Sequence, residues 1–247
     1  MKVAIFGDSH GDVSYMDWRK VAPHIGLGWP ELLSKFHKTS NYCAGGSGLW
    51  YSFKLFQDRH RKFEKVIFLP SQNHRFTLKL PERNAKIHVV PGFVDGDQLR
   101  QSLMLNDTPL DNNIVEAAAG YIDHILDYDK EHFLGNLLIK EIHNIRPDAI
   151  IVKCFNSNSE SLGISDLSRL EIEHWNTSAE ELRADGEHCD YRKCHMSDEN
   201  NEMVFKKILA AINNNKNFVD FNQSDFIMPK QPLNRYIFKV SGRKGNV

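Results

Sequence analysis

The stretch VAIFGDSHG, residues 3–11, is the part of the sequence that decides the fold. The four apolar residues Val3–Phe6 are typical of a short buried β-strand. The glycines, aspartate, serine and histidine that follow are typical of a tight polar turn. The same order, an apolar run and then a polar cluster, recurs along the chain.

Strand-like runs and helical segments alternate after residue 11. The strand-like runs are Ser40–Ala44, Val66–Leu69, Ile87–Val90 and Ala149–Phe155, and the helical segments are Trp29–Phe36, Leu49–Phe63, Ile114–Ile145 with a break near Gly135, and Glu202–Ile212. This alternation predicts a three-layer α/β/α fold with a central, mainly parallel sheet of about five strands. Ligands of such folds bind at the carboxyl ends of the strands, and the polar clusters of this chain fall there.

The chain is long enough for one sizeable core, because it has 247 residues, of which 41% are hydrophobic. We expect one domain over residues 1–215 and a C-terminal tail over residues 216–247 that packs on the domain or contacts a partner. Lys and Arg number 31 and Asp and Glu 32, which gives a net charge of -1. With this balance and no long basic run, a nucleic-acid partner is not expected.

No apolar run approaches the roughly 18 residues of a membrane helix, so a membrane partner is not expected either. The N-terminal apolar run is too short for the core of a secretory signal, which favours a cytoplasmic protein. The scattered cysteines are expected to be reduced thiols. They are Cys43, Cys154, Cys189 and Cys194. The oligomeric state is left open by the sequence.

Four polar clusters supply the groups that acyl transfer needs. They are Gly7-Asp8-Ser9, Gly45-Gly46, Asn73 and His195. Acyl transfer requires a nucleophilic oxygen, a base that takes its proton, and donors that hold the developing oxyanion. A serine in a strand-to-helix turn, an approachable glycine N–H, an asparagine amide and a late histidine meet these requirements together.

In order and spacing these clusters resemble the blocks of the SGNH/GDSL hydrolases, a family named for its Ser, Gly, Asn and His. The blocks correspond, in chain order, to Gly7-Asp8-Ser9, Asn41–Ser47, Ser71–His74 and Asp190–Ser197. The resemblance spans nearly all of residues 1–212. It implies a flavodoxin-like SGNH hydrolase fold and a serine-dependent carboxylic ester hydrolase that uses no cofactor and no metal.

The resemblance also implies a role for each block. Ser9 is the expected nucleophile and His195 the expected general base. The oxyanion hole would be formed by the N–H groups of Ser9 and Gly46 and by the amide of Asn73, with Gly45 as the alternative to Gly46.

Two blocks depart from the family pattern. The third has Ser71 and His74 where the family has Gly and Asp, and the fourth has Arg192 at the position of the triad acid. The nearest upstream acid is Asp190. Either Asp190 orients the His195 ring, as a triad acid does, or the site is a Ser–His dyad whose imidazole is oriented by a backbone carbonyl.

Side chains beside the blocks are candidates for substrate binding, namely His10, His74 and Arg75. For Arg75 a structural salt bridge is the competing interpretation, and Asp8 is expected to organise its turn through backbone hydrogen bonds. The expected substrate is a small-molecule or carbohydrate ester with a short acyl group, such as an O-acetyl ester of a sugar. The form of the chain suits bacterial or bacteriophage members of the family.

Two other functions fit parts of the pattern. Asp8-Ser9-His10-Gly11 also matches the Asp-x-His-Gly opening of metallophosphoesterases, whose later metal-ligand motifs are echoed only by Gln72-Asn73-His74. The altered third and fourth blocks are compatible with an SGNH-like binding or structural module without catalysis. His188-Cys189 and Cys194-His195 lack the usual spacing of a zinc site.

Overall fold

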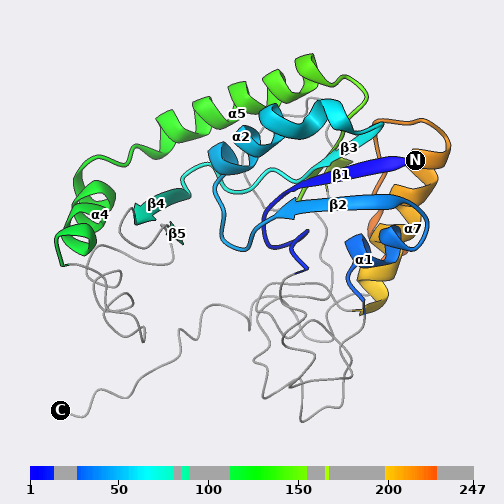
Figure 1. Ribbon diagram of the computed structural model, residues 1–247, viewed down its shortest axis with the longest axis horizontal. Coiled ribbons are helices and arrows are strands. Elements are labelled where there is room, and N and C mark those ends of the chain that lie inside the picture. The colour runs from blue at the N-terminus through cyan, green and yellow to red at the C-terminus, as the bar shows by residue number, and fades with distance from the viewer. Residues whose placement is uncertain (14–26, 81–84, 90–111, 155–164, 167–197, 227–247) are drawn as a thin grey trace, which may run out of the picture.

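The computed structural model describes residues 1–13, 27–80, 85–89, 112–154, 165–166 and 198–226. Within these residues, five parallel strands form one sheet in the order β2-β1-β3-β6-β7 (Figure 1). The strands are β1 (Lys2–Gly7), β2 (Lys38–Cys43), β3 (Lys65–Phe68), β6 (Ile150–Lys153) and the two-residue β7 (Ser165–Asp166). In the register, Gly7 at the end of β1 is paired with Cys43 at the end of β2, and Phe6 with Phe68 at the end of β3.

Strand β1 lies between two hydrophobic cores, one on each face of the sheet. Val3 and Ile5 belong to one core, and Ala4 and Phe6 belong to the other. All four side chains are fully buried. A parallel strand that is buried on both faces needs apolar residues at every position, which explains the uninterrupted apolar run of the sequence.

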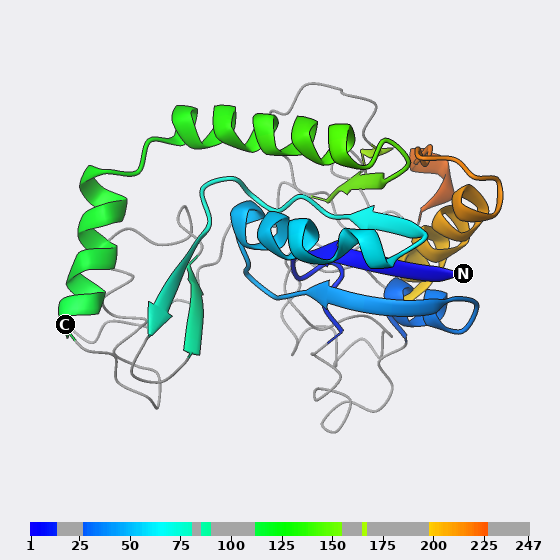
Figure 2. The ribbon, with the colours of Figure 1, turned by 45° about the horizontal axis from the view of Figure 1, so that its top comes forward.

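Helices pack against both faces of the sheet, and Figure 2 shows α2 and α5 on one side and α1 and α7 on the other. Their bounds are α1 (Trp29–Ser34), α2 (Leu49–Arg59), α5 (Tyr128–Ile145) and α7 (Asp198–Asn213), and a 3-10 turn, η2 (His60–Lys62), follows α2. The predicted mixed α/β fold with a parallel sheet is confirmed, and this packing is compatible with three layers. Helix α7 begins four residues earlier than predicted.

A hairpin outside the main sheet follows β3. Strands β4 (Phe76–Leu80) and β5 (Ala85–Val89) pair antiparallel and form a sheet of their own. Helix α4 (Asn112–His124) packs beside the hairpin, with the rings of Phe76 and Tyr121 5.0 Å apart. The strand predicted at Ile87–Val90 corresponds to β5, whereas β4 was not predicted.

The predicted helix break near Gly135 is wrong. The break falls between α4 and α5, at Ile125–Asp127, and Gly135 lies inside α5. Asp127 caps α5, because its carboxylate accepts hydrogen bonds from the backbone N–H groups of Asp129 and Lys130. A capped start fixes the helix boundary more strongly than the modest helix penalty of a glycine.

The first part of the C-terminal tail packs against the domain. Three residues of the tail are buried in the same core as α7, namely Val219, Phe221 and Phe226. The 3-10 turn η4 (Gln223–Asp225) lies between Phe221 and Phe226. Lys207 of α7 forms an ion pair with Asp225. Residues 227–247 of the predicted tail lie outside the described residues.

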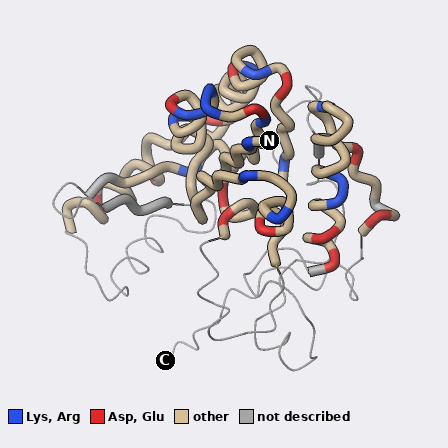
Figure 3. The backbone as a smooth tube through the Cα atoms, turned by 45° about the vertical axis from the view of Figure 1, so that its right-hand side comes forward, with Lys and Arg blue, Asp and Glu red and all other residues tan. Residues whose placement is uncertain are grey.

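Charge is distributed evenly over the described chain. In Figure 3, basic and acidic segments alternate along the helices and loops without a continuous stretch of one sign. None of the described helices is both long and apolar enough to cross a bilayer.

Lys65 is a buried charge at the amino end of β3. Its residue is 4% exposed, and its Nζ has no hydrogen-bond partner among the residues that the structure describes. Burial lowers the pKa of Lys65, Arg146 lowers it further, and Asp148 partly opposes them. The ammonium is therefore a destabilising feature of the folded state.

We expect Lys65→Met to raise the free energy of unfolding by about 1–2 kcal/mol at pH 7, because a buried polar group without a partner is removed. Between the lowered pKa and the usual lysine pKa, the unfolded chain binds more protons than the folded one, so wild-type stability rises with pH. The advantage of Lys65→Met should therefore shrink toward pH 10 in urea unfolding curves. The exposed control Lys62→Met should change stability by less than about 0.5 kcal/mol at either pH.

Candidate active site

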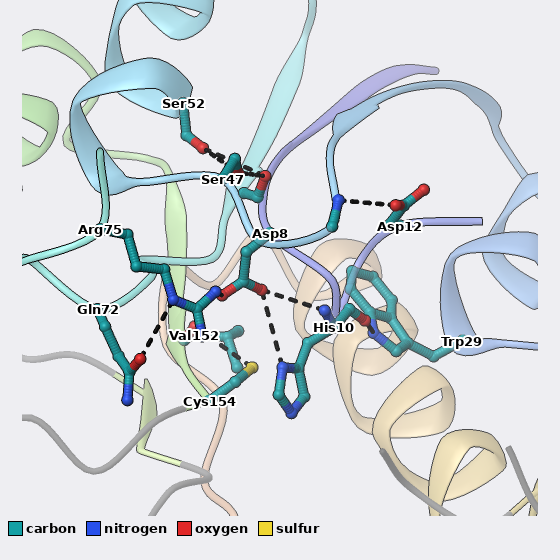
Figure 4. Close-up of polar contacts among 12 residues, drawn as sticks. Asp8, His10, Asp12, Trp29, Ser47, Ser52, Gln72, Arg75, Val152 and Cys154 are labelled. Atoms are coloured by element: carbon teal, nitrogen blue, oxygen red, sulfur yellow. Dashed lines mark hydrogen bonds and ion pairs between the residues drawn. The ribbon is translucent and has the colours of Figure 1, made fainter. Parts of the chain in front are cut away.

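The candidate site lies where the winding of the sheet reverses. The chain leaves β1 to form β2 on one side of it, and then returns to form β3 on the other side. The crevice outside the carboxyl ends of β1 and β3 is the usual ligand site of such a sheet. The loops that follow β1, β2 and β3 meet there, and Figure 4 shows their polar contacts.

Ser9 lies in a tight turn directly after β1. The N–H of Gly11 donates to the carbonyl of Asp8 at 3.1 Å, and the N–H of His10 donates to the Asp8 carboxylate at 3.1 Å. Ser9 and His10 are thus the two central residues of the turn, and Ser9 is half-buried. The expected role of Asp8 as organiser of this turn is confirmed by the second of these hydrogen bonds.

The turn requires a glycine at the end of β1. Gly7 has φ of 151°, and a Cβ there would come within 2.5 Å of the Leu69 Cβ after β3. Only glycine tolerates both the conformation and the close approach. The carbonyl of Gly7 accepts hydrogen bonds from the buried hydroxyls of Ser47 and Ser52, at 3.1 and 3.2 Å. These hydrogen bonds connect the start of α2 to the end of β1.

The two glycines after β2 lie beside Ser9. A Cβ on Gly45 would be 4.0 Å from the Cβ of Ser9. The N–H of Gly45 donates to the carboxylate of Asp12 at 2.7 Å, whereas Gly46 has φ of 71°, a left-handed conformation. The N–H of Gly45 is thus already bonded to Asp12, and the oxyanion role of Gly46, with Gly45 as its alternative, stays a prediction.

A buried ion pair joins the first and third loops. Arg75 Nη1 lies 3.6 Å from Asp8 Oδ2, and Nδ1 of His10 lies 3.7 Å from Asp8 Oδ1. The Asp8 carboxylate is fully buried, and Arg75 and His10 are each 8% exposed. Arg75 also donates through Nε to Gln72 at 3.2 Å. The structural salt bridge considered for Arg75 is therefore present, and substrate contact by Arg75 or His10 stays a prediction.

Asn73 and His74 face helix α5. The Asn73 amide nitrogen lies 3.3 Å from Nδ1 of His132 and 3.4 Å from the His132 carbonyl. The ring of His74 packs on Tyr128 with the centroids 5.2 Å apart. The oxyanion role of Asn73 and the substrate role of His74 stay predictions, and both side chains are positioned by α5.

His195 and Asp190, the predicted base and its orienting acid, lie outside the described residues. The described chain resumes at the start of α7, close to the Ser9 turn. Nε1 of Trp29 donates to the carbonyl of His10 at 2.9 Å, and the backbone N–H of Trp29 donates to the side chain of Asn201 at 3.2 Å. Trp29 therefore links the Ser9 turn to the first turns of α7.

Sequence reasoning missed several residues that build this site. They are polar side chains with partners distant in the chain: Asp12, Ser52 and His132. Ser47 was assigned only to a block, yet its hydroxyl donates to the carbonyl of Gly7. Asn41 was assigned only to a block, yet its amide donates to the carbonyl of Gly11 at 2.5 Å and its oxygen accepts from the N–H of Cys43 at 2.9 Å. The nearest sequence signal was their position near the ends of strands or in the first turns of helices, which does not identify a partner.

Cys43, at the end of β2, is a second nucleophilic side chain in this region. The residue as a whole is only partly buried, but its sulfur is packed against Gly11, where a Cβ would come within 2.5 Å of Sγ. Burial, and to a smaller extent Asp8, Asp12 and Cys154, raise the pKa of the Cys43 thiol well above its usual range. The thiol therefore stays protonated and unreactive at neutral pH.

We accordingly expect iodoacetamide at pH 8 to leave Cys43 unmodified in the folded protein. In about 8 M urea, which unfolds most domains, the same reagent should alkylate Cys43. Peptide mass spectrometry measures the two extents of modification. Rapid alkylation of Cys43 in the folded protein would contradict this environment for the thiol.

The residues of the Asp-x-His motif contact one another and Arg75. Among the residues that the structure describes, no group of three or more His, Cys, Asp or Glu side chains is arranged to hold a metal ion. The guanidinium beside Asp8 adds a positive charge where a metallophosphoesterase would need a cation-binding carboxylate. The described geometry thus offers no support for the metal-dependent alternative.

Comparison of the chain with protein-family models, with curated proteins and with solved structures gave no match.

Proposed function

We propose that this chain is a serine-dependent hydrolase of carboxylic esters with a flavodoxin-like SGNH hydrolase fold. The observation that carries the proposal is the position of Ser9, half-buried in a turn at the switch point of the sheet, beside the glycine turn after β2. Counted along the chain within this sheet, the strands have the order 2-1-3-4-5, which is the flavodoxin-like order.

The proposed chemistry is acyl transfer to Ser9 and then to water. The Ser9 hydroxyl attacks the ester carbonyl while His195 takes its proton, and the oxyanion is held by the N–H groups of Ser9 and Gly46 and by the Asn73 amide. Collapse of the tetrahedral intermediate breaks the C–O bond, and His195 returns the proton to the leaving alcohol. Water then attacks the acyl-enzyme by the same roles in reverse, which regenerates Ser9.

The anchoring of α7 supports the role of His195. Three peptide units join His195 to Asp198, the first residue of α7, and such a segment spans at most about 11 Å. The first turns of α7 are linked through Trp29 to the carbonyl of His10, next to Ser9. We propose that His195 acts as the base from the segment that precedes α7, with Asp190 or a backbone carbonyl as its orienting partner.

For the substrate we propose a small-molecule or carbohydrate ester with a short acyl group, such as an O-acetyl ester. A series of p-nitrophenyl esters from acetate to octanoate tests the acyl length, and acetylated sugars test the alcohol side. Highest kcat/KM on the acetate member is the expected result. A maximum at the long chains would assign a lipid-type substrate instead.

The decisive test is covalent labelling with a fluorophosphonate probe, followed by peptide mass spectrometry. We expect one adduct on Ser9, and loss of labelling in His195→Ala. A folded protein with no adduct and no esterase activity would favour the non-catalytic module. Phosphoesterase activity that a chelator abolishes and Ser9→Ala retains would favour the metal-dependent alternative.

A further inference from the structure

Helix α5 contacts the predicted oxyanion asparagine through two features that no sequence motif marked. The first is His132, whose Nδ1 and backbone carbonyl lie 3.3 and 3.4 Å from the amide nitrogen of Asn73. The second is Gly135, one turn further along the same face of α5. A Cβ on Gly135 would overlap the amide group of Asn73, so the amide lies directly on the helix backbone.

We infer that His132 and Gly135 together position the Asn73 amide for catalysis, an inference that rests on the proposed esterase function. The amide nitrogen carries two hydrogens. In this arrangement Nδ1 and the backbone carbonyl of His132 share one of these hydrogens, which fixes the rotation of the amide. The other hydrogen is the one that the proposed mechanism assigns to the oxyanion. His132 is thus a positioning residue that acts through Asn73 and does not itself touch the substrate.

The burial of Gly135 supports this role. Gly135 is buried in the interior of α5, where glycine costs helix stability relative to alanine. Gly120, in α4, is the contrasting case, because a Cβ there would meet no atom of the described residues within 4 Å beyond its chain neighbours and its own helix backbone. At Gly135 the missing side chain makes the space that Asn73 fills, so the two glycines offer a matched pair of substitutions.

The first test is the pair Gly135→Ala and Gly120→Ala. The atoms that the new methyl group of Gly135→Ala meets belong to the end of a flexible side chain, so the fold should persist while the Asn73 amide moves. We expect kcat for p-nitrophenyl acetate to fall about 10–100-fold with KM nearly unchanged, because a displaced donor weakens only transition-state binding. Gly120→Ala should keep kcat and raise Tm by about 2–4 °C.

The second test is a double-mutant cycle between Asn73 and His132. Asn73→Ala alone should lower kcat by on the order of 10²–10³-fold, and His132→Ala alone by about 10–100-fold. In the Asn73→Ala background, His132→Ala should have no further effect on kcat, because its target is gone. His132→Asn, whose side-chain oxygen can replace Nδ1 as acceptor, should recover most of the kcat, and Lys130→Ala on the exposed face of α5 should leave kcat unchanged.

The outcomes separate this inference from the proposed function. If Ser9 is labelled by the fluorophosphonate probe and esters are hydrolysed, but the effects of Asn73→Ala and His132→Ala multiply, the positioning role is wrong and the esterase assignment stands. If Gly135→Ala keeps full kcat, the positioning role is wrong as well. If Ser9 is neither labelled nor needed for hydrolysis, the proposed function fails and this inference fails with it.

Discussion

Ser9→Ala should abolish ester hydrolysis, with kcat lowered by on the order of 10⁴–10⁶-fold, because removal of the nucleophile of an acyl-transfer site removes the covalent route altogether. The residual rate should reflect only the oxyanion donors and substrate binding. Hydrolysis of p-nitrophenyl acetate measures the loss, and the fluorophosphonate adduct should disappear in parallel.

The same substitution should hardly affect stability. The two hydrogen bonds that close the turn, from the N–H of Gly11 to the carbonyl of Asp8 and from the N–H of His10 to the carboxylate of Asp8, are kept in this variant. Ser34→Ala is the matched control, because Ser34 is an exposed residue at the end of α1 whose hydroxyl donates to the carbonyl of Glu31. Both variants should unfold within about 1 kcal/mol of wild type. Full esterase activity in Ser9→Ala would exclude Ser9 as the nucleophile.

The main elements of the fold could be predicted because their signals are local. Val3–Phe6 is apolar at every position, and the structure buries this strand between two cores. The turn chemistry of Gly7 and Asp8 is equally local, since it depends on a left-handed φ and on a hydrogen bond to the residue two positions along. Strand alternation then limits the possible topologies to a few.

Local sequence signals gave a wrong helix boundary where a glycine and a helix cap competed within one helical region. Glycine at 135 was taken to mark a helix break, but the start of α5 is set by the cap at Asp127. In the structure, the absence of a side chain at Gly135 leaves space for the side chain of Asn73, which comes from the loop after β3. A contact of this kind depends on tertiary packing, which overrides helix propensity and leaves no periodic trace in the sequence.

The residues of the candidate site also fall into those that the sequence could identify and those that it could not. Its glycines, its serine and its asparagine follow strands and could be found from the sequence. The partners that hold them, such as Arg75 on Asp8 and His132 on Asn73, come from loops and helices far along the chain. A single sequence contains no information on pairs of distant polar residues, so these contacts required the structure.

Arg75→Ala should lower the free energy of unfolding by about 3–5 kcal/mol, because it breaks a buried ion pair. Arg75 is 8% exposed and lies 3.6 Å from the fully buried carboxylate of Asp8. Within the described part of the chain, its removal leaves the buried carboxylate of Asp8 with the contacts of His10 alone. Urea unfolding measures the loss, and Arg61→Ala, which removes an exposed arginine of the 3-10 turn η2, should cost less than about 0.5 kcal/mol.

The cause of this loss can be isolated by neutralising the partner. In Asp8→Asn the side-chain oxygen can still accept the hydrogen bond from the N–H of His10, but no buried charge depends on Arg75. Arg75→Ala should therefore cost at least about 1 kcal/mol less in the Asp8→Asn background than in wild type. Equal costs in both backgrounds would mean that Arg75 stabilises the site through its packing and its hydrogen bond to Gln72, and not through the charge of Asp8.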